Sequence, residues 1–348
     1  MNFGLVGAGA IGLLRARAVG RTPECRLMAV ADQDATRARA AAPPGAQACD
    51  DYRRIIERPD VEAVIVSTPP ASHQEIALAA LAAGKHVLCE KPLANSVAAC
   101  RQMVEAARAA GRLLATGFNH RYFPAVRFLK ETLDSGRIGE LDHVRAFAGH
   151  QGLSQFQAPW MYSQEAIGGG ALCDVGLHVI DLVRYVLGEV TEVFGAATAN
   201  IWKLGGAEDN GFALLRSPAG KVATLHATWT EWKGYGFFVE AYGDRGMARA
   251  AYAPMFAMAI SMERPGGERR RHQRLYPWIA VREKLRGWQT TTCLAFEEEL
   301  ADFVRLARDP AARVHLADGV AGWRAIEIAN AVYQSSLSRQ AVRLAELE

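Results

Sequence analysis

The segment with the clearest chemical potential lies between Gly168 and Asp181 and begins with three consecutive glycines. A helix predicted to begin near Leu172 places Asp174 and His178 four residues apart on one face, with Asp181 three residues further on. A carboxylate can orient a neighbouring imidazole, and histidine titrates near neutral pH, so the pair suits general acid–base catalysis. The glycines would permit a loop that approaches a ligand closely. Two other interpretations stay open: a core histidine satisfied by a neighbouring aspartate, and a metal site, although no third ligand has suitable spacing.

A lysine in the first half of the chain offers a second reactive group. Lys91 follows the apolar run His86–Cys89, a predicted strand, and lies between Glu90 and Pro92. A lysine there could hold a hydroxyl or carbonyl oxygen, or move a proton. Taken alone, such a residue is more often a surface lysine.

The sequence GAGAIG at residues 7–12 joins an apolar run, Phe3–Val6, to a second one, Leu13–Val19. This is the order strand, glycine turn, helix of a dinucleotide-binding unit. The first glycine makes the turn, the second lets the main chain approach a pyrophosphate, and the third lets the helix pack on the strand. N–H groups at the helix start then face the phosphates. The predicted cofactor contacts in this loop are Gly7, Gly9, Ala10, Ile11 and Gly12. The alternative is a glycine turn in an ordinary βαβ unit.

An acidic residue supports the cofactor interpretation. Asp32 stands twenty residues after Gly12 and closes the apolar run Leu27–Ala31. Its carboxylate can accept hydrogen bonds from an adenosine ribose and would repel a 2′-phosphate, which favours NAD over NADP. Arg37 and Arg39 lie nearby and keep NADP possible, although solvated helix charges are the simpler interpretation of both.

Strands and helices alternate through residues 1–120, the predicted Rossmann domain. The run Ala63–Val66 is continuously apolar, as in a strand buried on both faces, and a helix is predicted at 72–83. Such alternation predicts right-handed crossovers and a doubly wound parallel sheet. Because ligands bind at the carboxyl ends of these strands, the polar residues that follow them should line one crevice. These residues are Asp32, Thr68, Glu90, Lys91 and Asn119.

Residues 121–348, the predicted substrate-binding and oligomerisation domain, follow another pattern. After a predicted helix at 123–134 come strand-like segments separated by glycine-rich turns. They lie at Leu141–Ala148, Val190–Asn200, Phe212–Leu215, Val222–Trp229 and Phe237–Tyr242. This order predicts an α+β domain with a large, open, mostly antiparallel sheet and helices on one face. Residues 264–290 are predicted to be an exposed irregular segment, and the chain ends in two helices.

Composition sets limits on function. The 348 residues suggest about two domains. Lys and Arg total 40 against 37 Asp and Glu, a net charge of +3 that gives no argument for nucleic acid or a membrane surface. The six cysteines are scattered and include no CxxC pair, so we expect no bound metal. The N-terminus is unlike a signal peptide, and no uncharged apolar stretch has membrane-spanning length. We therefore expect a cytoplasmic protein with reduced cysteines.

Several motifs together resemble one family. They are the glycine pattern at 7–12, Thr68-Pro69-Pro70-x-x-His73, Glu90-Lys91-Pro92, Gly117-Phe118-Asn119-His120-Arg121 and the segment from Gly169 to Asp181. This order resembles the glucose–fructose oxidoreductase / inositol dehydrogenase (Gfo/Idh/MocA) family over nearly the whole chain. The resemblance implies a Rossmann domain and a second domain whose open sheet often mediates homodimers or homotetramers. It also implies NAD(P)-dependent oxidation or reduction at a sugar or polyol carbon.

The resemblance assigns roles by motif match. Lys91, Asp174 and His178 become the catalytic set and contacts of the substrate. The implied cofactor contacts outside the glycine loop are Thr68, Pro69, His73, Glu90 and Lys91, to which the strand-end argument adds Asn119. A cis peptide bond is implied before Pro92.

Substrate choice is expected where the second domain departs from the family pattern, at Gln151–Tyr162 and in the segment 264–290, which is rich in arginine (Arg269, Arg270, Arg271 and Arg274). Arg121 and Trp160 are candidate substrate contacts. An indole could stack on a sugar face, although Trp160 could equally be a core tryptophan.

The expected reaction is reversible transfer of a hydride between a nicotinamide and a secondary alcohol carbon. His178, oriented by Asp174, would remove the hydroxyl proton, and Lys91 would stabilise the developing oxyanion or relay the proton. Two alternatives remain. One is another enzyme on the same scaffold, such as a dihydrodiol dehydrogenase, a biliverdin-type reductase or an NAD-dependent glycosidase. The other is a non-enzymatic NAD(P)-binding sensor, which would not need this catalytic set.

Overall fold

The computed structural model describes residues 1–152 and 158–346. The chain forms two compact units: unit 1 comprises Met1–Tyr122 and Glu283–Trp323, and unit 2 comprises Phe123–Arg282 and Arg324–Glu348. The first division lies close to the boundary predicted at residue 120. Residues 283–323, however, were expected in the second domain and belong to unit 1.

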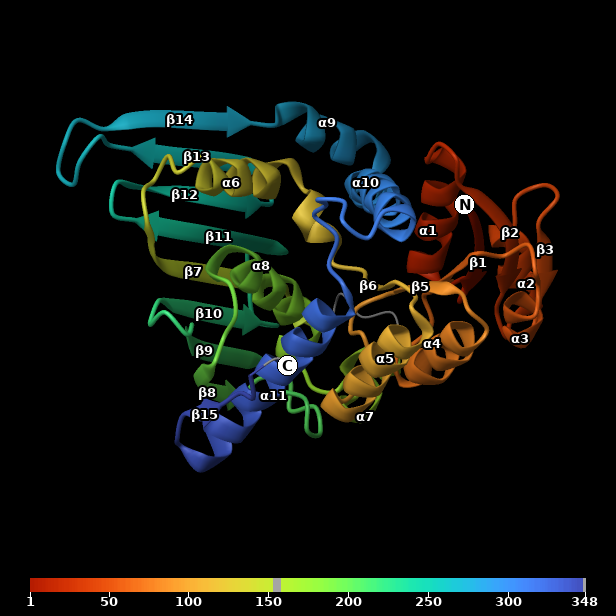
Figure 1. Ribbon diagram of the computed structural model, residues 1–348. Helices are drawn as coiled ribbons and strands as arrows, with labels where there is room; N and C mark the ends of the chain where they lie inside the picture. The colour runs from red at the N-terminus through yellow and green to blue at the C-terminus, as the bar shows by residue number, and fades with distance from the viewer. Residues whose placement is uncertain (153–157, 347–348) are drawn as a thin grey trace. The chain divides into compact units, whose positions relative to one another are not determined.

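Unit 1 is built on a six-stranded parallel sheet (Figure 1). Its strands are β1 (Asn2–Val6), β2 (Arg26–Ala31), β3 (Gln47–Cys49), β4 (Ala63–Val66), β5 (His86–Cys89) and β6 (Leu114–Thr116). The order β3-β2-β1-β4-β5-β6 is that of a doubly wound dinucleotide-binding fold, so the predicted fold class is confirmed. The strand order reverses between β1 and β4, and this is the point where such sheets bind their ligands.

The helices of unit 1 differ in how they begin. They are α1 (Ala10–Arg21), α2 (Ala35–Ala41), α3 (Arg53–Ile56), α4 (His73–Ala82), α5 (Val97–Ala110) and α10 (Gln289–Arg308), with the 3-10 turns η1 (Pro70–Ser72) and η2 (Asn119–Tyr122). Asp34 caps α2 by accepting from the Thr36 N–H, and Ser96 caps α5 by accepting from the Ala99 N–H. The N-cap of α1 is Gly9, whose lack of a side chain leaves the start of that helix open to a ligand.

Helix α10 accounts for the return of the chain to unit 1. Its residues Phe296, Leu300 and Phe303 join Phe3 and Leu5 of β1 in one buried cluster. The rings of Phe3 and Phe303 lie 5.9 Å apart between centroids. An amphipathic pattern predicts a helix but does not reveal which sheet the helix covers, so the sequence placed it in the wrong unit.

Unit 2 is built on a nine-stranded sheet in the order β14-β13-β12-β11-β7-β10-β9-β8-β15 (Figure 1). Its strands are β7 (Leu141–Gly149), β8 (Glu192–Thr198), β9 (Asn210–Arg216), β10 (Val222–Thr228), β11 (Gly236–Gly243), β12 (Gly246–Tyr252), β13 (Phe256–Ser261), β14 (Arg270–Leu275) and β15 (Val342–Arg343). Among the described residues of this sheet, β7 and β10 pair in parallel and the other neighbouring strands run antiparallel, which confirms the predicted mostly antiparallel sheet.

Helices cover one face of this sheet. In Figure 1, α6 (Pro124–Asp134) lies over β12 and β13, and α8 (Leu177–Leu187) lies over β7, β10 and β11. The other helical segments are η4 (Pro159–Tyr162), α7 (Gln164–Ile167), the π-helical turn η5 (Leu172–Gly176), α9 (Pro277–Arg286) and α11 (Gly319–Ser338). Residues 164–187 have the length and apolarity of a membrane-spanning helix, but 83% of their apolar window is buried inside the protein, as in a core helix.

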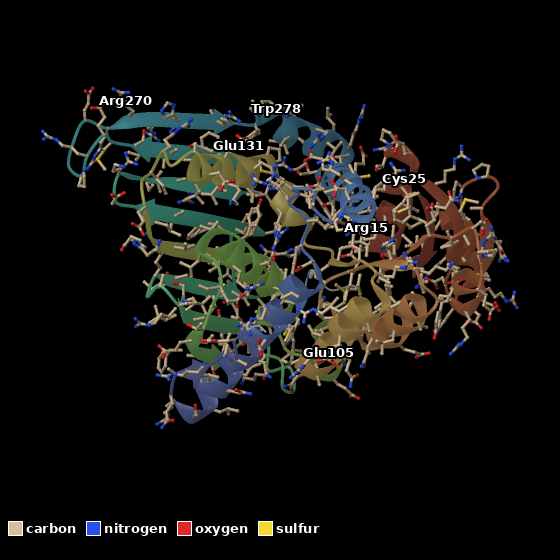
Figure 2. The ribbon with its side chains drawn as sticks, in the orientation of Figure 1. Arg15, Cys25, Glu105, Glu131, Arg270 and Trp278 are labelled. Atoms are coloured by element: carbon tan, nitrogen blue, oxygen red, sulfur yellow. The ribbon has the colours of Figure 1, made fainter. Side chains whose placement is uncertain are left out.

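The prediction of an irregular segment at 264–290 is wrong. This stretch contains β14, which pairs antiparallel with β13, and the helix α9, which begins two residues after β14 ends. All six residues of β14 are exposed, and Arg270 and Trp278 are visible at this edge in Figure 2. An edge strand needs only main-chain pairing on one side, so its side chains carry no alternating pattern that would reveal it.

Candidate active site

The glycine loop after β1 has the geometry of a pyrophosphate-binding turn. Gly7 has a φ of +93°, and a Cβ there would lie 2.6 Å from the Ser67 carbonyl. A Cβ on Gly12 would lie 2.0 Å from the Gly7 oxygen, so Gly12 lets α1 pack on the loop. Gly9 faces open space, and Ala10 and Ile11 are exposed in the first turn, where N–H groups have no partner within the helix. These features fit an anionic dinucleotide.

Asp32 lies at the end of β2 beside this loop. Its Oδ2 accepts from the Ala8 N–H at 2.7 Å, and its Oδ1 accepts from the Asp34 N–H at 2.9 Å. The carboxylate is therefore fixed in direction while staying partly exposed. Arg37 is 63% exposed and pairs with Asp34, which agrees with a solvated helix charge.

Thr68, Pro69 and His73 lie after β4, but they differ in their exposure to solvent. Thr68 is partly exposed and Pro69 is exposed, whereas His73 is completely buried. The His73 Nε2 lies 2.7 Å from the Thr68 oxygen, and its Nδ1 lies 2.9 Å from the Pro92 oxygen. Burial lowers the pKa of His73. His73 thus connects the loop after β4 to the loop after β5. Because it is buried, it would influence a bound cofactor by positioning these two loops.

Glu90 and Lys91 follow β5, and the Lys91–Pro92 bond is cis, as the resemblance implied. The Glu90 Oε1 accepts from the Arg15 Nε at 2.6 Å, and the Arg15 Nη1 donates to Glu299 Oε2 at 2.5 Å. Arg15 is fully buried, and its guanidinium carbon lies 3.5 Å from the ring centroid of Phe296. Glu90, expected to contact the cofactor, is therefore held by Arg15, which no motif in the sequence singled out.

The turn η2 holds two further predicted residues. Asn119 and Arg121 are both buried. The Arg121 Nη1 donates to the His315 and Leu316 oxygens at 3.2 Å, so Arg121, expected to contact the substrate, braces this segment of unit 1. His120 is also buried; burial, with the charge of Lys91, lowers the pKa of His120 to about 3.

In unit 2 a helical segment begins at Leu172 as predicted, but its first turn is π-helical. The Gly176 N–H donates to the Ala171 oxygen at 2.9 Å, five residues back. Asp174 lies in this turn, and His178 lies in the first turn of α8.

Two residues that the sequence did not single out hold Asp174. Its Oδ2 lies 2.8 Å from the His150 Nε2 and accepts from the Trp229 Nε1 at 3.0 Å. His150 follows β7 and Trp229 follows β10, and the last residues of these parallel strands, Gly149 and Thr228, are register partners. The signal that could have found His150 is a histidine two residues after the predicted strand Leu141–Ala148.

The glycines before Asp174 serve protein packing, which corrects the expected role in approaching a ligand. A Cβ on Gly169 would lie 2.0 Å from the Tyr333 hydroxyl, and one on Gly170 would lie 2.2 Å from the Glu208 oxygen. The Glu208 carboxylate accepts from the Gly170 and Leu172 N–H groups, both at 2.7 Å. Burial raises the pKa of Glu208 to about 7. Glu208 therefore braces the start of the helical segment.

Trp160, in η4, is 40% exposed, so it is not a core tryptophan. Residues 153–157 of the segment expected to select the substrate lie outside the described residues.

Comparison with known proteins identifies the family. Residues 1–118 match the model of an oxidoreductase family with an NAD-binding Rossmann fold, and residues 126–249 match the GFO/IDH/MocA C-terminal domain. The chain is 31% identical over 253 residues to myo-inositol 2-dehydrogenase of Thermotoga maritima, covering 71% of this chain and 74% of that protein. The chain belongs to the Gfo/Idh/MocA family.

Solved structures of similar proteins share the fold. An oxidoreductase domain protein from Kribbella flavida is 27% identical with a TM-score of 0.85, covering 99% of both chains. Levoglucosan dehydrogenase in complex with NADH and L-sorbose is 24% identical with a TM-score of 0.87, covering 100% of this chain and 99% of that one. Membership of the Gfo/Idh/MocA family confirms the predicted enzyme class, an oxidoreductase with NAD as its cofactor.

Proposed function

We propose that this protein interconverts a secondary alcohol and a ketone on a sugar, a polyol or a sugar derivative, with NAD as its cofactor. One observation carries the proposal: the carboxylate of Asp174 is held by His150 and Trp229 at the start of the segment that presents His178. Asp174 lies four residues before His178 in one helical segment, and a carboxylate so placed can orient the imidazole for general acid–base chemistry.

The residues of unit 1 would hold the cofactor. The glycine loop and the start of α1 would bind its pyrophosphate, and Asp32 would accept from its ribose. When bound, NAD supplies the acceptor or donor of the hydride. The ammonium group of Lys91 would donate a hydrogen bond to the substrate oxygen and stabilise the negative charge that develops there. His178, oriented by Asp174, would take the hydroxyl proton in oxidation and return it in reduction.

The substrate class is supported by the relatives. The T. maritima relative is named for myo-inositol, and the similar structure is named for levoglucosan, a sugar derivative. Exposed Trp160 offers an aromatic face of the kind that stacks on sugar rings. We propose it as a substrate contact.

The test combines binding and turnover. Nicotinamide fluorescence is titrated with NADH and NADPH, and a panel of polyols, sugars and nucleotide sugars is then screened with NAD. Reduction of NAD by one member, and a loss of roughly 100-fold or more in kcat for His178→Ala with NADH binding retained, would support the proposal. Binding of NADH without turnover in either direction would favour a sensor. Failure to bind either nucleotide would contradict the role of the glycine loop.

We also infer that a second copy of the chain covers the open face of the sheet in unit 2, as in a homodimer or homotetramer. Side chains alternate along β8 and β9, so those opposite the buried residues face away from the helices. Phe194, Phe212 and Leu214 on this face are 49%, 43% and 42% exposed. Apolar side chains gathered on one face are typical of an interface.

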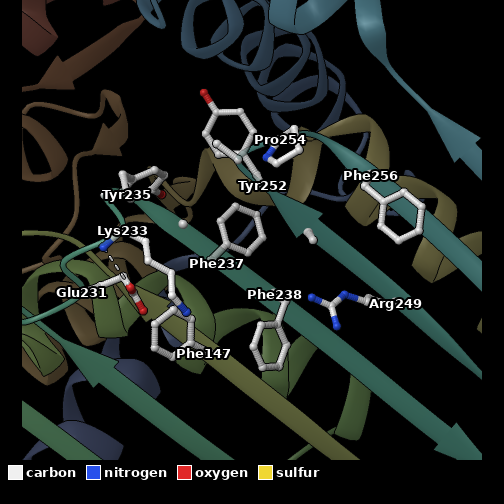
Figure 3. Close-up of a pocket in the computed structure, with 14 residues that line it drawn as sticks. Phe147, Glu231, Lys233, Tyr235, Phe237, Phe238, Arg249, Tyr252, Pro254 and Phe256 are labelled. Atoms are coloured by element: carbon white, nitrogen blue, oxygen red, sulfur yellow. Dashed lines mark hydrogen bonds between the residues drawn. The ribbon is translucent and has the colours of Figure 1, made fainter.

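The same face continues across the sheet to a pocket of about 520 Å³ (Figure 3). Phe147 and Phe238 stack there with ring centroids 5.7 Å apart, and the Arg249 guanidinium lies 4.8 Å from the Phe238 ring. His226 lies between the rings of Phe147 and Phe212 and so links the pocket to β9. The aromatic surface therefore runs over β9, β10, β7 and β11.

A further inference from the structure

His150 is held in a fixed position at the end of β7. Its main-chain N–H donates to the Thr228 main-chain oxygen at 3.1 Å, and its main-chain oxygen accepts from the Glu231 main-chain N–H at 3.1 Å. Only 7% of its side chain is exposed. The main chain of His150 is therefore held on both sides, and its side chain is buried.

The contacts of the ring define its tautomer. The Gly152 N–H donates to the His150 Nδ1 at 3.0 Å, so this nitrogen is an acceptor. In a neutral imidazole the proton is then on Nε2, which lies 2.8 Å from the Asp174 Oδ2. Gly152 has a φ of +68°, and a Cβ there would lie 2.3 Å from the Trp202 Nε1, so this turn requires glycine. The turn after β7 thus selects the form of His150 that donates to Asp174.

Trp229 supplies a second fixed donor to the same oxygen. The side chain of Trp229 is fully buried. Its main-chain N–H donates to the Asp209 main-chain oxygen at 2.8 Å, and its main-chain oxygen accepts from the Trp202 Nε1 at 2.9 Å. The Asp174 Oδ2 therefore lies within hydrogen-bond distance of two ring nitrogens, those of His150 and Trp229. Both residues directly follow strands that are neighbours in the sheet. This arrangement determines how the carboxylate is turned.

We propose that His150 is a positioning residue: as a neutral donor through Nε2 it fixes, together with Trp229, the carboxylate of Asp174 and through it the orientation of His178. This rests on the proposed function, in which Asp174 and His178 act on the substrate. His150 contributes a hydrogen bond from outside the reacting groups, as partners of catalytic or metal-binding side chains commonly do.

The experiment compares two substitutions. His150→Leu removes the donor with little change in size, whereas His150→Gln keeps an N–H donor near the position of Nε2. His150→Leu is expected to lower kcat roughly 10- to 100-fold with little change in KM or in NADH affinity, and His150→Gln to recover most of the loss. His143→Leu is the matched control, because His143 lies in β7, is partly exposed and pairs with Asp142; this variant should keep kcat within about 2-fold.

A double-substitution cycle separates positioning from a general structural effect. If His150 acts through Asp174, His150→Leu should cost little further activity in an Asp174→Asn background. Equal losses in both backgrounds, full activity of His150→Leu, or no recovery by His150→Gln would each overturn the proposal. Unchanged turnover of Asp174→Asn and His178→Ala would instead contradict the proposed function.

Histidine ¹⁵N NMR gives a readout that needs no substrate. In the folded protein the His150 signals should show the tautomer protonated on Nε2, and the titration of His178 should change in His150→Leu but not in His143→Leu. A proton on Nδ1 of neutral His150, or an unchanged His178 titration, would overturn the proposal even if every substrate in the panel failed.

Discussion

Asp32 is the residue at which the choice between NAD and NADP can be tested most directly. Its carboxylate is fixed by the Ala8 and Asp34 N–H groups and stays partly exposed. Hydrogen bonds to a charged acceptor contribute about 1.5–3 kcal/mol, so Asp32→Ser should weaken NADH binding roughly 10- to 100-fold. NADPH binding should weaken less or improve, because the charge that repels a 2′-phosphate is gone. Fluorescence titration of both nucleotides measures the ratio.

Arg37 provides the control for this prediction. It is 63% exposed and pairs with Asp34, itself 49% exposed, so Arg37→Ala should change either affinity by no more than about 2-fold. Tighter binding of NADPH than NADH by the unaltered protein would contradict the assigned role of Asp32. A large loss of NADPH affinity in Arg37→Ala would show that the arginine, and not the aspartate, sets the preference.

At the scale of elements, the sequence predicted the strands whose burial produces a recognisable apolar pattern. β4 and β5 are buried on both faces and read as continuous apolar runs, so their predicted bounds agree with the structure. β14 is exposed throughout and carries no such signal. β12 has alternating burial, but its buried positions are Gly246, Ala248, Ala250 and Tyr252, three of them small residues that also suit turns and helices.

In the candidate site, too, some residues could be predicted from the sequence and others could not. The motif residues, among them Lys91, Asp174 and His178, were found because each lies in a short pattern next to a predicted strand or helix. Their partners were not found, because pairing depends on tertiary structure: Arg15 and Glu299 are 284 residues apart in the chain. His150 and Trp229 meet only because β7 and β10 pair in parallel with the register that brings their ends together.

The bridge between α1, α10 and the end of β5 predicts a stability effect. Arg15 lies fully buried between Glu90 and the fully buried Glu299. Removing one partner of a buried ion pair costs about 3–5 kcal/mol, because a buried charge is left uncompensated. We expect Arg15→Met to lower the free energy of unfolding by about that amount in urea denaturation.

Two further variants test the cause of this loss. Arg15→Met combined with Glu299→Met removes one of the stranded carboxylates and should recover part of the lost stability. Arg17→Met, on the exposed side of α1, should change the free energy of unfolding by no more than about 0.5 kcal/mol. A single Arg15→Met variant as stable as the unaltered protein would show that the bridge does not hold these elements together.

The whole molecule is expected to self-associate through the sheet of unit 2. Phe212, on β9, is 43% exposed on the aromatic surface and stacks on His226 with ring centroids 4.2 Å apart. A charge at this position would be buried without a partner in an assembly, so Phe212→Glu should shift the protein to monomers, as measured by light scattering after gel filtration. Leu337→Glu, at an 87% exposed site on α11, is the control and should leave the assembly unchanged. A monomeric unaltered protein would refute the inferred interface.

The pH dependence of stability should reflect two buried groups whose contributions change in opposite directions. Burial raises the pKa of Glu208 to about 7, from 4.5 in the unfolded chain. Glu208 therefore binds its proton more tightly when the protein is folded, so its contribution to stability is fully present below pH 4.5 and is lost as the pH rises through about 7. Burial and Lys91 lower the pKa of His120 from 6.5 to about 3, so its contribution is present above pH 6.5 and is lost as the pH falls towards 3.

The opposing signs partly cancel between pH 4.5 and 6.5, so each group has to be isolated by a variant. Relative to Glu208→Gln, the unaltered protein should lose roughly 3 kcal/mol of unfolding free energy as the pH rises from 4.5 to 7, since one pKa unit corresponds to about 1.4 kcal/mol. Relative to His120→Gln, it should instead lose stability as the pH falls below 6.5. Variant curves that run parallel to that of the unaltered protein at every pH would show that neither group titrates differently on folding.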